Sequence, residues 1–189
     1  RKDALYCDAP GTRRRRAART VLAELHSCLT AWLAPILCFT AEEAWLARNP
    51  SDGDSVHLRQ FPEIPGEWRD DELKARWDQI RTLRRVVTGA LEVERREKRI
   101  GSSLQAHVHV YGAGQFRDAV KNVDVAAIFI TSGVDFYDDP APEDAAVFAL
   151  GDVPGVAVAV SLADGEKCSR CWRVLPEVGK VHDDLCHRC

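Results

Sequence analysis

The sequence predicts a protein of several parts, α first and then α+β: a helical bundle, a small α+β unit and a C-terminal four-cysteine knuckle. Apolar residues recur at helical spacing through about residue 104 and alternate, as in strands, after it. Four of the seven cysteines lie in the last 22 residues. We therefore expect a helical domain at residues 1–104, an α+β domain at 105–164 and the knuckle at 165–189.

The first long helix is predicted from about residue 13 to residue 33. Apolar side chains recur there at spacings of four, three and four residues, which places them on one face: Val21, Leu25, Cys28 and Trp32. We expect this face to pack inside a helical bundle.

Pro35 predicts a break or kink, and a second helix follows at Thr40. The segment Thr40–Glu43 has the pattern of a capping box, in which Thr40 and Glu43 satisfy the free amides of the first turn. Glu42 and Glu43 could also form an acid/base couple. We favour the capping role, because a helix start needs these acceptors.

A Pro/Gly/Asp-rich crossing at residues 49–65, with a short strand at 55–58, leads to a long helix at about 70–98. Acidic residues at its start and basic residues at its end suit the helix dipole, and Gly101 is the natural stop. The predicted apolar stripe consists of Leu73, Trp77, Ile80, Leu83, Val87 and Leu91.

The periodicity changes to alternation at residues 106–111, which predicts a half-buried strand, and residues 115–122 resemble a short helix. Further strands are predicted at residues 125–131, 134–137, 147–150 and 156–162. The segment 138–144 is an acidic loop. The second part is therefore small and α+β.

Composition excludes several classes of protein. Hydrophobic residues make up 46% and charged residues 29%, as in ordinary globular proteins. No run of 18 apolar residues predicts a membrane span, and the first residues resemble neither a signal nor a transit peptide. The chain begins at Arg1 and contains no methionine, so we expect a fragment of a longer protein.

The net charge of −3 is unevenly distributed. Residues 1–34 carry +4 and residues 67–104 carry +2, whereas residues 105–165 carry −7. A polyanion would be attracted to the two basic segments and repelled by the acidic one. This asymmetry indicates the face that a nucleic acid would use.

The knuckle has the spacing Cys168-x2-Cys171-x14-Cys186-x2-Cys189. Each pair can present two sulfurs from a tight turn, and two pairs complete a tetrahedron around Zn²⁺. Two disulfides, a redox pair or rubredoxin-like iron remain alternatives. We favour one structural zinc in a protein of the reducing cytoplasm. Binding of this zinc would fold the tail, and its four ligands would leave no coordination position open for catalysis.

Four thiolates and one Zn²⁺ carry a net charge of −2, which nearby cations can offset: Lys167, Arg170, Arg173 and Arg188. His182 and His187 could replace a cysteine, although four thiols already saturate the site. Trp172 has two interpretations: a hydrophobic plug over the knuckle, or a platform for base stacking flanked by arginines.

Three segments resemble the C-terminal region of bacterial-type isoleucyl-tRNA synthetases. Residues 29–45 are similar to the anticodon-binding helices shared by the isoleucyl, valyl and leucyl enzymes, although Cys38 stands where the family has proline. Residues 91–104 narrow the resemblance to the isoleucyl enzymes, and residues 165–172 with 185–189 resemble their zinc tail. The resemblance extends over nearly the whole chain.

The resemblance implies a class Ia anticodon-binding domain from a cytoplasmic, monomeric parent enzyme that joins isoleucine to its tRNA with ATP. The family's catalytic domain binds ATP and Mg²⁺ through a His-Ile-Gly-His type motif and a Lys-Met-Ser-Lys-Ser type loop. Neither is present, and the editing domain is also missing. We therefore expect no catalytic residue and no activity here, but binding to the anticodon region of isoleucine tRNA.

The resemblance also implies a set of tRNA contacts. Phosphates would meet basic helix faces, although each of these charges could simply be solvated: Arg13–Arg16, Arg19, Arg84, Arg85, Arg95, Arg96 and Arg99. Arg170 would hydrogen-bond to the RNA, Trp172 would stack on a base and Arg173 would flank it. The alternative is a free-standing zinc-ribbon module that binds nucleic acid or protein, which would not need the helical domain.

Overall fold

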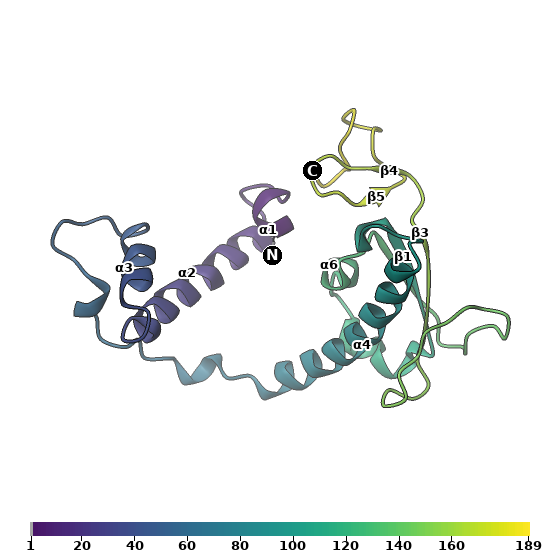
Figure 1. Cartoon of the computed structure of the whole chain (residues 1–189), viewed down its shortest axis with the longest axis horizontal. Helices are drawn as coiled ribbons and strands as arrows, with labels where there is room; N and C mark the ends of the chain where they lie inside the picture. The colour runs from purple at the N-terminus through teal and green to yellow at the C-terminus, as the bar shows by residue number, and fades with distance from the viewer. Residues whose placement is uncertain (1) are drawn as a thin grey trace. The chain divides into compact units, whose positions relative to one another are not determined.

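The computed structural model describes residues 2–189 (Figure 1). These residues form two compact units, one up to Arg69 and one over Asp70–Cys189. Within the described residues, no helix has both the length and the apolar character needed to cross a membrane.

The first unit is helical. It contains α1 (Lys2–Tyr6), α2 (Arg13–Leu33) and α3 (Cys38–Leu46), followed by single 3₁₀ turns η1 (Val56–Leu58) and η2 (Gly66–Trp68). In Figure 1, α1 lies at the start of the long helix α2, and α3 lies at its other end. The bounds of α2 match the predicted helix.

Much of the predicted apolar face of α2 is exposed. Cys28 is buried, but Val21, Leu25 and Trp32 are 57%, 48% and 42% exposed. The buried core that α2, α3 and η1 share is small, with Ala34 among its members and Trp45 packed against it. The expected burial of this stripe is therefore not achieved within the unit.

The start of α3 differs from the predicted capping box at Thr40–Glu43. The helix begins earlier, and its N-cap residue, Leu37, makes no side-chain capping bond. Glu42 instead accepts hydrogen bonds from the Ser55 hydroxyl at 3.0 Å and the Val56 amide at 2.8 Å. The capping prediction was wrong, because the helix already begins at Cys38, so Thr40 lies within its first turn. The Glu42 carboxylate fixes the following crossing. The predicted strand in the crossing is the turn η1.

The second unit begins with α4 (Asp71–Arg96). Asp70 caps the helix, since its carboxylate accepts from the Leu73 amide at 2.7 Å. The predicted stripe is buried from Ile80 onward, together with neighbours on the same side: Ile80, Leu83, Val86, Val87, Ala90 and Leu91. These side chains share one core with the sheet.

The sheet has three strands in the order β2-β1-β3, with β1 (Ala106–Tyr111) at its centre. It pairs in parallel with β2 (Gly133–Phe136) and antiparallel with β3 (Ala157–Leu162). Val108 and Val110 are fully buried toward the core. Alternate side chains of β1 therefore lie on the other face.

Four short elements flank β1: η3 (Ser103–Gln105) precedes it, and η4 (Ala113–Phe116), α5 (Arg117–Val120) and α6 (Val125–Phe129) lie between β1 and β2. The predicted helix at 115–122 corresponds to η4 and α5. The strand predicted at 125–131 was wrong, because Asp124 caps a helical turn by accepting from the Ala127 amide at 3.1 Å. A short apolar run does not distinguish strand from helix.

The strand predicted at 147–150 is reduced to one bridge. Phe148 pairs with Val158 through two backbone hydrogen bonds of 2.8 Å, without a continuous ladder. The predicted strands at 134–137 and 156–162 are present as β2 and β3 with boundaries shifted by a residue.

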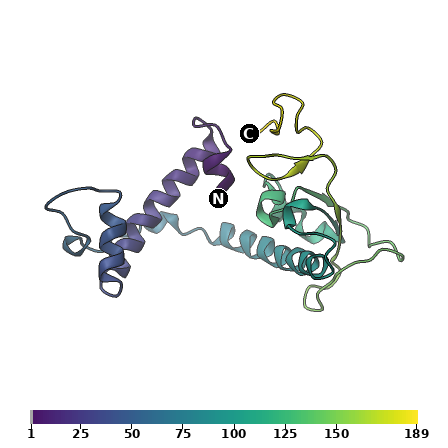
Figure 2. The ribbon, with the colours of Figure 1, turned by 45° about the horizontal axis from the view of Figure 1, so that its top comes forward.

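The structure places α4 with the sheet, whereas the sequence predicted it in a helical domain ending at residue 104. The physical reason is that its apolar stripe packs against β1 and β3, with Ile80 and Leu83 in the same core as Val108 and Val158. The compact unit therefore begins at Asp70 and includes the four-cysteine knuckle. Figure 2 shows α4 beside the sheet.

Candidate zinc knuckle and nucleic-acid interface

The four-cysteine knuckle starts with a two-stranded hairpin, β4 (Glu166–Lys167) and β5 (Val174–Leu175). Between the strands, the Trp172 amide donates to the Cys168 carbonyl at 2.9 Å, which closes the turn that carries the first cysteine pair. The second pair comes from a similar turn, in which the Cys189 amide donates to the Cys186 carbonyl at 3.0 Å.

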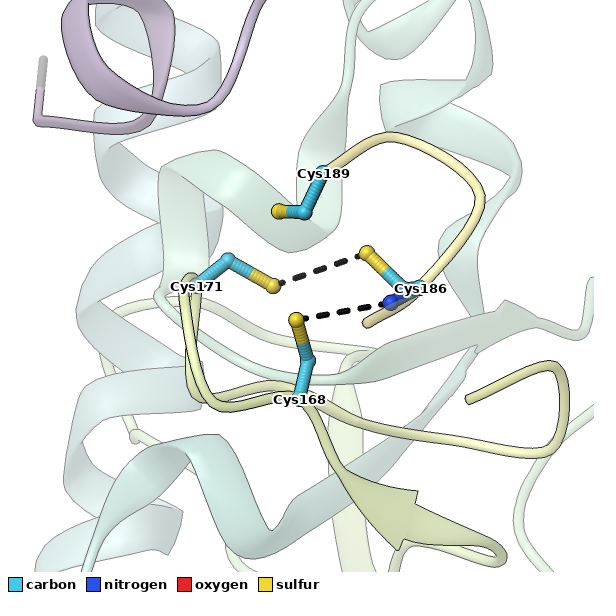
Figure 3. A group of neighbouring side chains, drawn as sticks. All are labelled: Cys168, Cys171, Cys186 and Cys189. Carbon is cyan, nitrogen blue, oxygen red and sulfur yellow. Dashed lines mark hydrogen bonds between the residues drawn. The ribbon is translucent and has the colours of Figure 1, made fainter. Parts of the chain in front are cut away.

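The four sulfurs lie together (Figure 3). All four Sγ atoms are within 4.8 Å of one another, and Cys171 Sγ is 3.8 Å from Cys186 Sγ. None of the four forms a disulfide. A tetrahedral zinc with Zn–S bonds of about 2.3 Å has S–S edges of about 3.8 Å, so the donor set fits zinc.

The two most perturbed sulfurs have opposite pKa shifts. Burial acts to raise the pKa of Cys168, but backbone amides of Cys171, Cys186 and Arg170 outweigh it and hold the pKa at about 6. Burial, together with the neighbouring sulfurs, raises the pKa of Cys171 to about 11. In this folded arrangement the Cys168 sulfur is therefore more readily ionised than the Cys171 sulfur.

Zinc loading at neutral pH is expected to release protons from the cysteines, because zinc binds thiolates and an unperturbed thiol, with a pKa of about 8.5, is mostly protonated there. Lower pH should weaken binding, since protons then compete for all four sulfurs. Calorimetric titration of the metal-free chain with ZnCl₂ in buffers of different ionisation enthalpy measures this release. Equal apparent enthalpies in all buffers would contradict it.

Neither histidine of the knuckle belongs to the sulfur cluster. His182 and His187 are both exposed, and the grouped ligand atoms come from cysteines alone. Arg170 Nη1 donates to the Cys189 carbonyl at 2.9 Å, which ties the two cysteine turns together. Its exposed position keeps a positive charge beside the sulfurs.

Trp172 lies at the edge of the knuckle with 51% of its surface exposed. Its indole Nε1 donates to the Ser169 carbonyl at 3.1 Å, which fixes the ring against the turn, and Lys167 Nζ is 5.8 Å from the ring centroid. Its φ of +70° is an uncommon backbone conformation for tryptophan. Such outliers cluster at functional sites.

Arg173 is half-buried and points toward the sheet unit. Its Nη2 donates to the Ser132 carbonyl at 2.5 Å, and the adjacent Val174 amide donates to the Ser132 hydroxyl at 2.7 Å. The same hydroxyl donates to the Leu104 carbonyl at 2.5 Å. Ser132 thus anchors the knuckle to the sheet, a role that the sequence pattern did not indicate.

The arginines predicted on the long helix are exposed: Arg84, Arg85, Arg95, Arg96 and Arg99. Each has a partner within the unit, such as Asp152 for Arg85 at 2.7 Å and Glu94 for Arg99 at 2.5 Å. Arg84 and Arg95 lie on one side of α4, about three turns or 16 Å apart. The partner of Arg84 is the Ile128 carbonyl, and the other four pair with carboxylates. Exposed ion pairs contribute only about 0–1 kcal/mol, so a phosphate can replace the carboxylate.

The first unit contains a basic groove of about 720 Å³ along α2. Arg16 and Arg19 line it from the predicted basic face, and Arg48 lines it from the end of α3. Sequence periodicity did not bring Arg48 to this site, because the residue follows another helix. Arg13 is also exposed, whereas Arg14 and Arg15 are half-buried.

A four-cysteine knuckle with an exposed tryptophan, in a chain with basic helical faces, has the features of a zinc-finger protein that binds nucleic acid. Residues 165–189 match the zinc finger found in FPG and IleRS. Residues 1–110 match the family described as anticodon-binding domain of tRNA ligase. The chain belongs to this anticodon-binding family.

Proteins with similar sequences are isoleucine–tRNA ligases. The chain is 54% identical over 180 residues to the isoleucine–tRNA ligases of Agrobacterium fabrum and Brucella abortus, covering 95% of this chain and 18% of each ligase. It is 52% identical over 192 residues to that of Ruegeria pomeroyi, covering 100% of this chain and 19% of the ligase. The chain thus spans about a fifth of the length of these relatives.

Proposed function

We propose that this chain is the region of an isoleucine–tRNA ligase that binds the anticodon stem and loop of isoleucine tRNA. The observation that carries the proposal is the presence, in one chain, of an anticodon-binding domain and a four-cysteine knuckle with an exposed tryptophan. Ligation with ATP and Mg²⁺ then belongs to other parts of the parent enzyme, acting in a reducing cytoplasm as a monomer.

The metal centre is proposed to be structural. Cys168, Cys171, Cys186 and Cys189 would hold one Zn²⁺, which supplies charge and geometry but takes no part in a reaction. Four protein ligands leave no position for substrate. The task of the centre is to hold Trp172 and Arg170 in fixed positions on a segment too short to have its own apolar core.

Base recognition is assigned to the edge of the knuckle. The exposed face of Trp172 can stack on an unpaired base, and Arg170 beside it can donate to a base edge or a phosphate. The contacts of Arg173 with Ser132 support a different role, in which its charge attracts RNA while its guanidinium fixes the knuckle on the sheet.

Phosphate binding is assigned to the basic helix surfaces. The exposed arginines of α4 and the groove of Arg16, Arg19 and Arg48 present charge without base identity, which suits contact with a helical stem. The loop at residues 138–144 carries acidic side chains and would be repelled by RNA. The sheet unit would therefore act as a spacer that orients the knuckle.

The exposed apolar stripe of α2 also supports function within a longer protein. Val21, Leu25 and Trp32 are more exposed than is usual for residues at helical spacing on one face. Other parts of the parent ligase would cover them.

Filter binding with the 189-residue chain tests the proposal. Isoleucine tRNA should bind more tightly than the same tRNA carrying a different anticodon, because only the loop differs. Equal affinity for the two RNAs would contradict anticodon recognition and favour a general nucleic-acid-binding module. The salt concentration must be the same in both measurements, since phosphate contacts depend on it.

Replacement of Trp172 by alanine is expected to weaken binding of isoleucine tRNA by ~1–3 kcal/mol, because a stacked base loses its platform. The fold should survive, since the indole is half-exposed. Trp68→Ala is the matched control, because Trp68 is 55% exposed and lies outside the knuckle. If the variant binds isoleucine tRNA with unchanged affinity and keeps its zinc, Trp172 only covers the knuckle and does not stack on a base.

A further inference from the structure

The sheet has a second face that the proposed function does not use. Because side chains alternate along a strand, His107 and His109 of β1 lie opposite the buried Val108 and Val110. The parallel register pairs His109 with Asp135 of β2. Two imidazoles and one carboxylate therefore meet on the solvent side of a three-stranded sheet.

The three side chains are close enough to share one ion. His107 Nε2 is 2.9 Å from Asp135 Oδ2, and His109 Nδ1 is 3.7 Å from the same oxygen. One ligand atom from each residue lies within 4.8 Å of the other two. Ligands at about 2.0–2.2 Å from a zinc ion lie about 3.0–3.5 Å apart, so small side-chain rotations bring all three atoms into range.

The surroundings hold both imidazoles in place. His109 Nε2 is 3.0 Å from the Ser161 hydroxyl of β3, so donation to Ser161 leaves the Nδ1 lone pair toward Asp135. Metal-binding histidines commonly have such a partner on the other ring nitrogen. A Cβ at position 133 would lie 2.3 Å from His107 Nδ1, so Gly133 makes room for that ring.

The site is also accessible and of suitable charge. The side chains of His107, His109 and Asp135 are 32%, 26% and 50% exposed. Burial and the neighbouring His107 lower the pKa of His109, against the opposing effect of Asp135, which favours the neutral imidazole that binds metals. The carboxylate supplies the negative charge.

We propose that His107, His109 and Asp135 form a second metal site, separate from the four-cysteine knuckle, that binds Zn²⁺. Two histidines and one carboxylate are a ligand set that leaves at least one coordination position open. This position can take water or an external oxygen ligand. The site differs in kind from the closed sulfur cluster, and it does not depend on tRNA recognition.

Calorimetry with zinc itself tests the site. The chain is first loaded with one equivalent of Zn²⁺, desalted and then titrated with ZnCl₂, so that no other metal displaces the ion at the cysteines. We expect one further binding event per chain. A flat titration at protein concentrations up to the solubility limit would overturn the proposal.

Three variants locate the second event. His109→Ala should abolish it, Asp135→Asn should weaken it while keeping the size of the side chain, and Ser161→Ala should weaken it about 10–100-fold by releasing the ring of His109. His57→Ala is the matched control, because His57 is an exposed histidine in the first unit. Circular dichroism and zinc content before titration check the fold and the first site.

A second zinc bound equally well by wild type, Ser161→Ala and Asp135→Asn would also overturn the proposal, even if His109→Ala failed to fold. Histidine ring resonances provide a separate readout. Zinc should shift those of His107 and His109 and leave that of His57 unchanged.

Discussion

Replacement of Cys171 by alanine is expected to abolish stoichiometric zinc binding and to unfold residues 165–189, while the α4–sheet core stays folded. Structural zinc in small fingers contributes an apparent free energy of about 10–16 kcal/mol, which makes this the largest effect predicted for the chain. Cys171 is fully buried, so a water molecule cannot replace its sulfur as a zinc ligand without disturbing the turn.

The reason lies in what the knuckle buries. Within residues 165–189, the buried side chains are those of Cys168, Cys171 and Cys186, and the hairpin contains only two residue pairs. Ordering costs about 1–2 kcal/mol per residue in backbone entropy alone, and so little structure cannot offset it without a metal. The bonds to Ser132 would hold only the start of the segment.

Metal analysis and amide resonances measure this result. Signals from residues 165–189 should collapse to disordered positions, and tRNA selectivity should be lost with them. Cys38→Ala is the control, because Cys38 is an exposed thiol outside the cluster. An ordered knuckle in zinc-free Cys171→Ala would show that the metal does not organise it.

Replacement of Leu83 by alanine is expected to lower the free energy of unfolding of the second unit by about 2–5 kcal/mol. Leu83 is fully buried and lies in the core with Val108 and Val110, so its loss leaves a cavity between α4 and the sheet. Hydrogen exchange of the Val108 and Val110 amides, which report on the central strand, measures the effect.

Leu73→Ala is the matched control for this change. Leu73 lies on the same helix but is 46% exposed, and truncation there should cost no more than about 0.5 kcal/mol. Unchanged exchange of the β1 amides in Leu83→Ala would contradict the packing of α4 on the sheet. It would favour the predicted helical domain that ends at residue 104.

Local signals in the sequence located several elements well. The bounds of α2 and β1 follow directly from the periods of their apolar residues. Local patterns misled where tertiary contacts compete. The helix α3 begins at Cys38 instead of Thr40, and residues 125–129 form a helical turn instead of a strand.

The candidate sites also combine features that local spacing predicts with features that only long-range contacts decide. The spacing of the cysteine pairs was enough to identify the metal-binding segment, because a C-x-x-C turn is a local structure. It could not indicate Ser132, which lies 36 residues before the first of those cysteines and anchors the knuckle through its hydroxyl and carbonyl. Nor could it bring Arg48 to the groove of Arg16 and Arg19.

By itself, therefore, the sequence determined the knuckle, the main helices, the central strand and the resemblance to isoleucyl-tRNA synthetases, all of which depend on short-range spacing or on recognisable segments. Only the tertiary structure decided that α4 belongs with the sheet and that His109 and Asp135 face each other. The physical reason is that strand register and helix packing depend on residues far apart in the chain. A helix with a given apolar face can pack against other helices or against a sheet, and its sequence period does not distinguish the two.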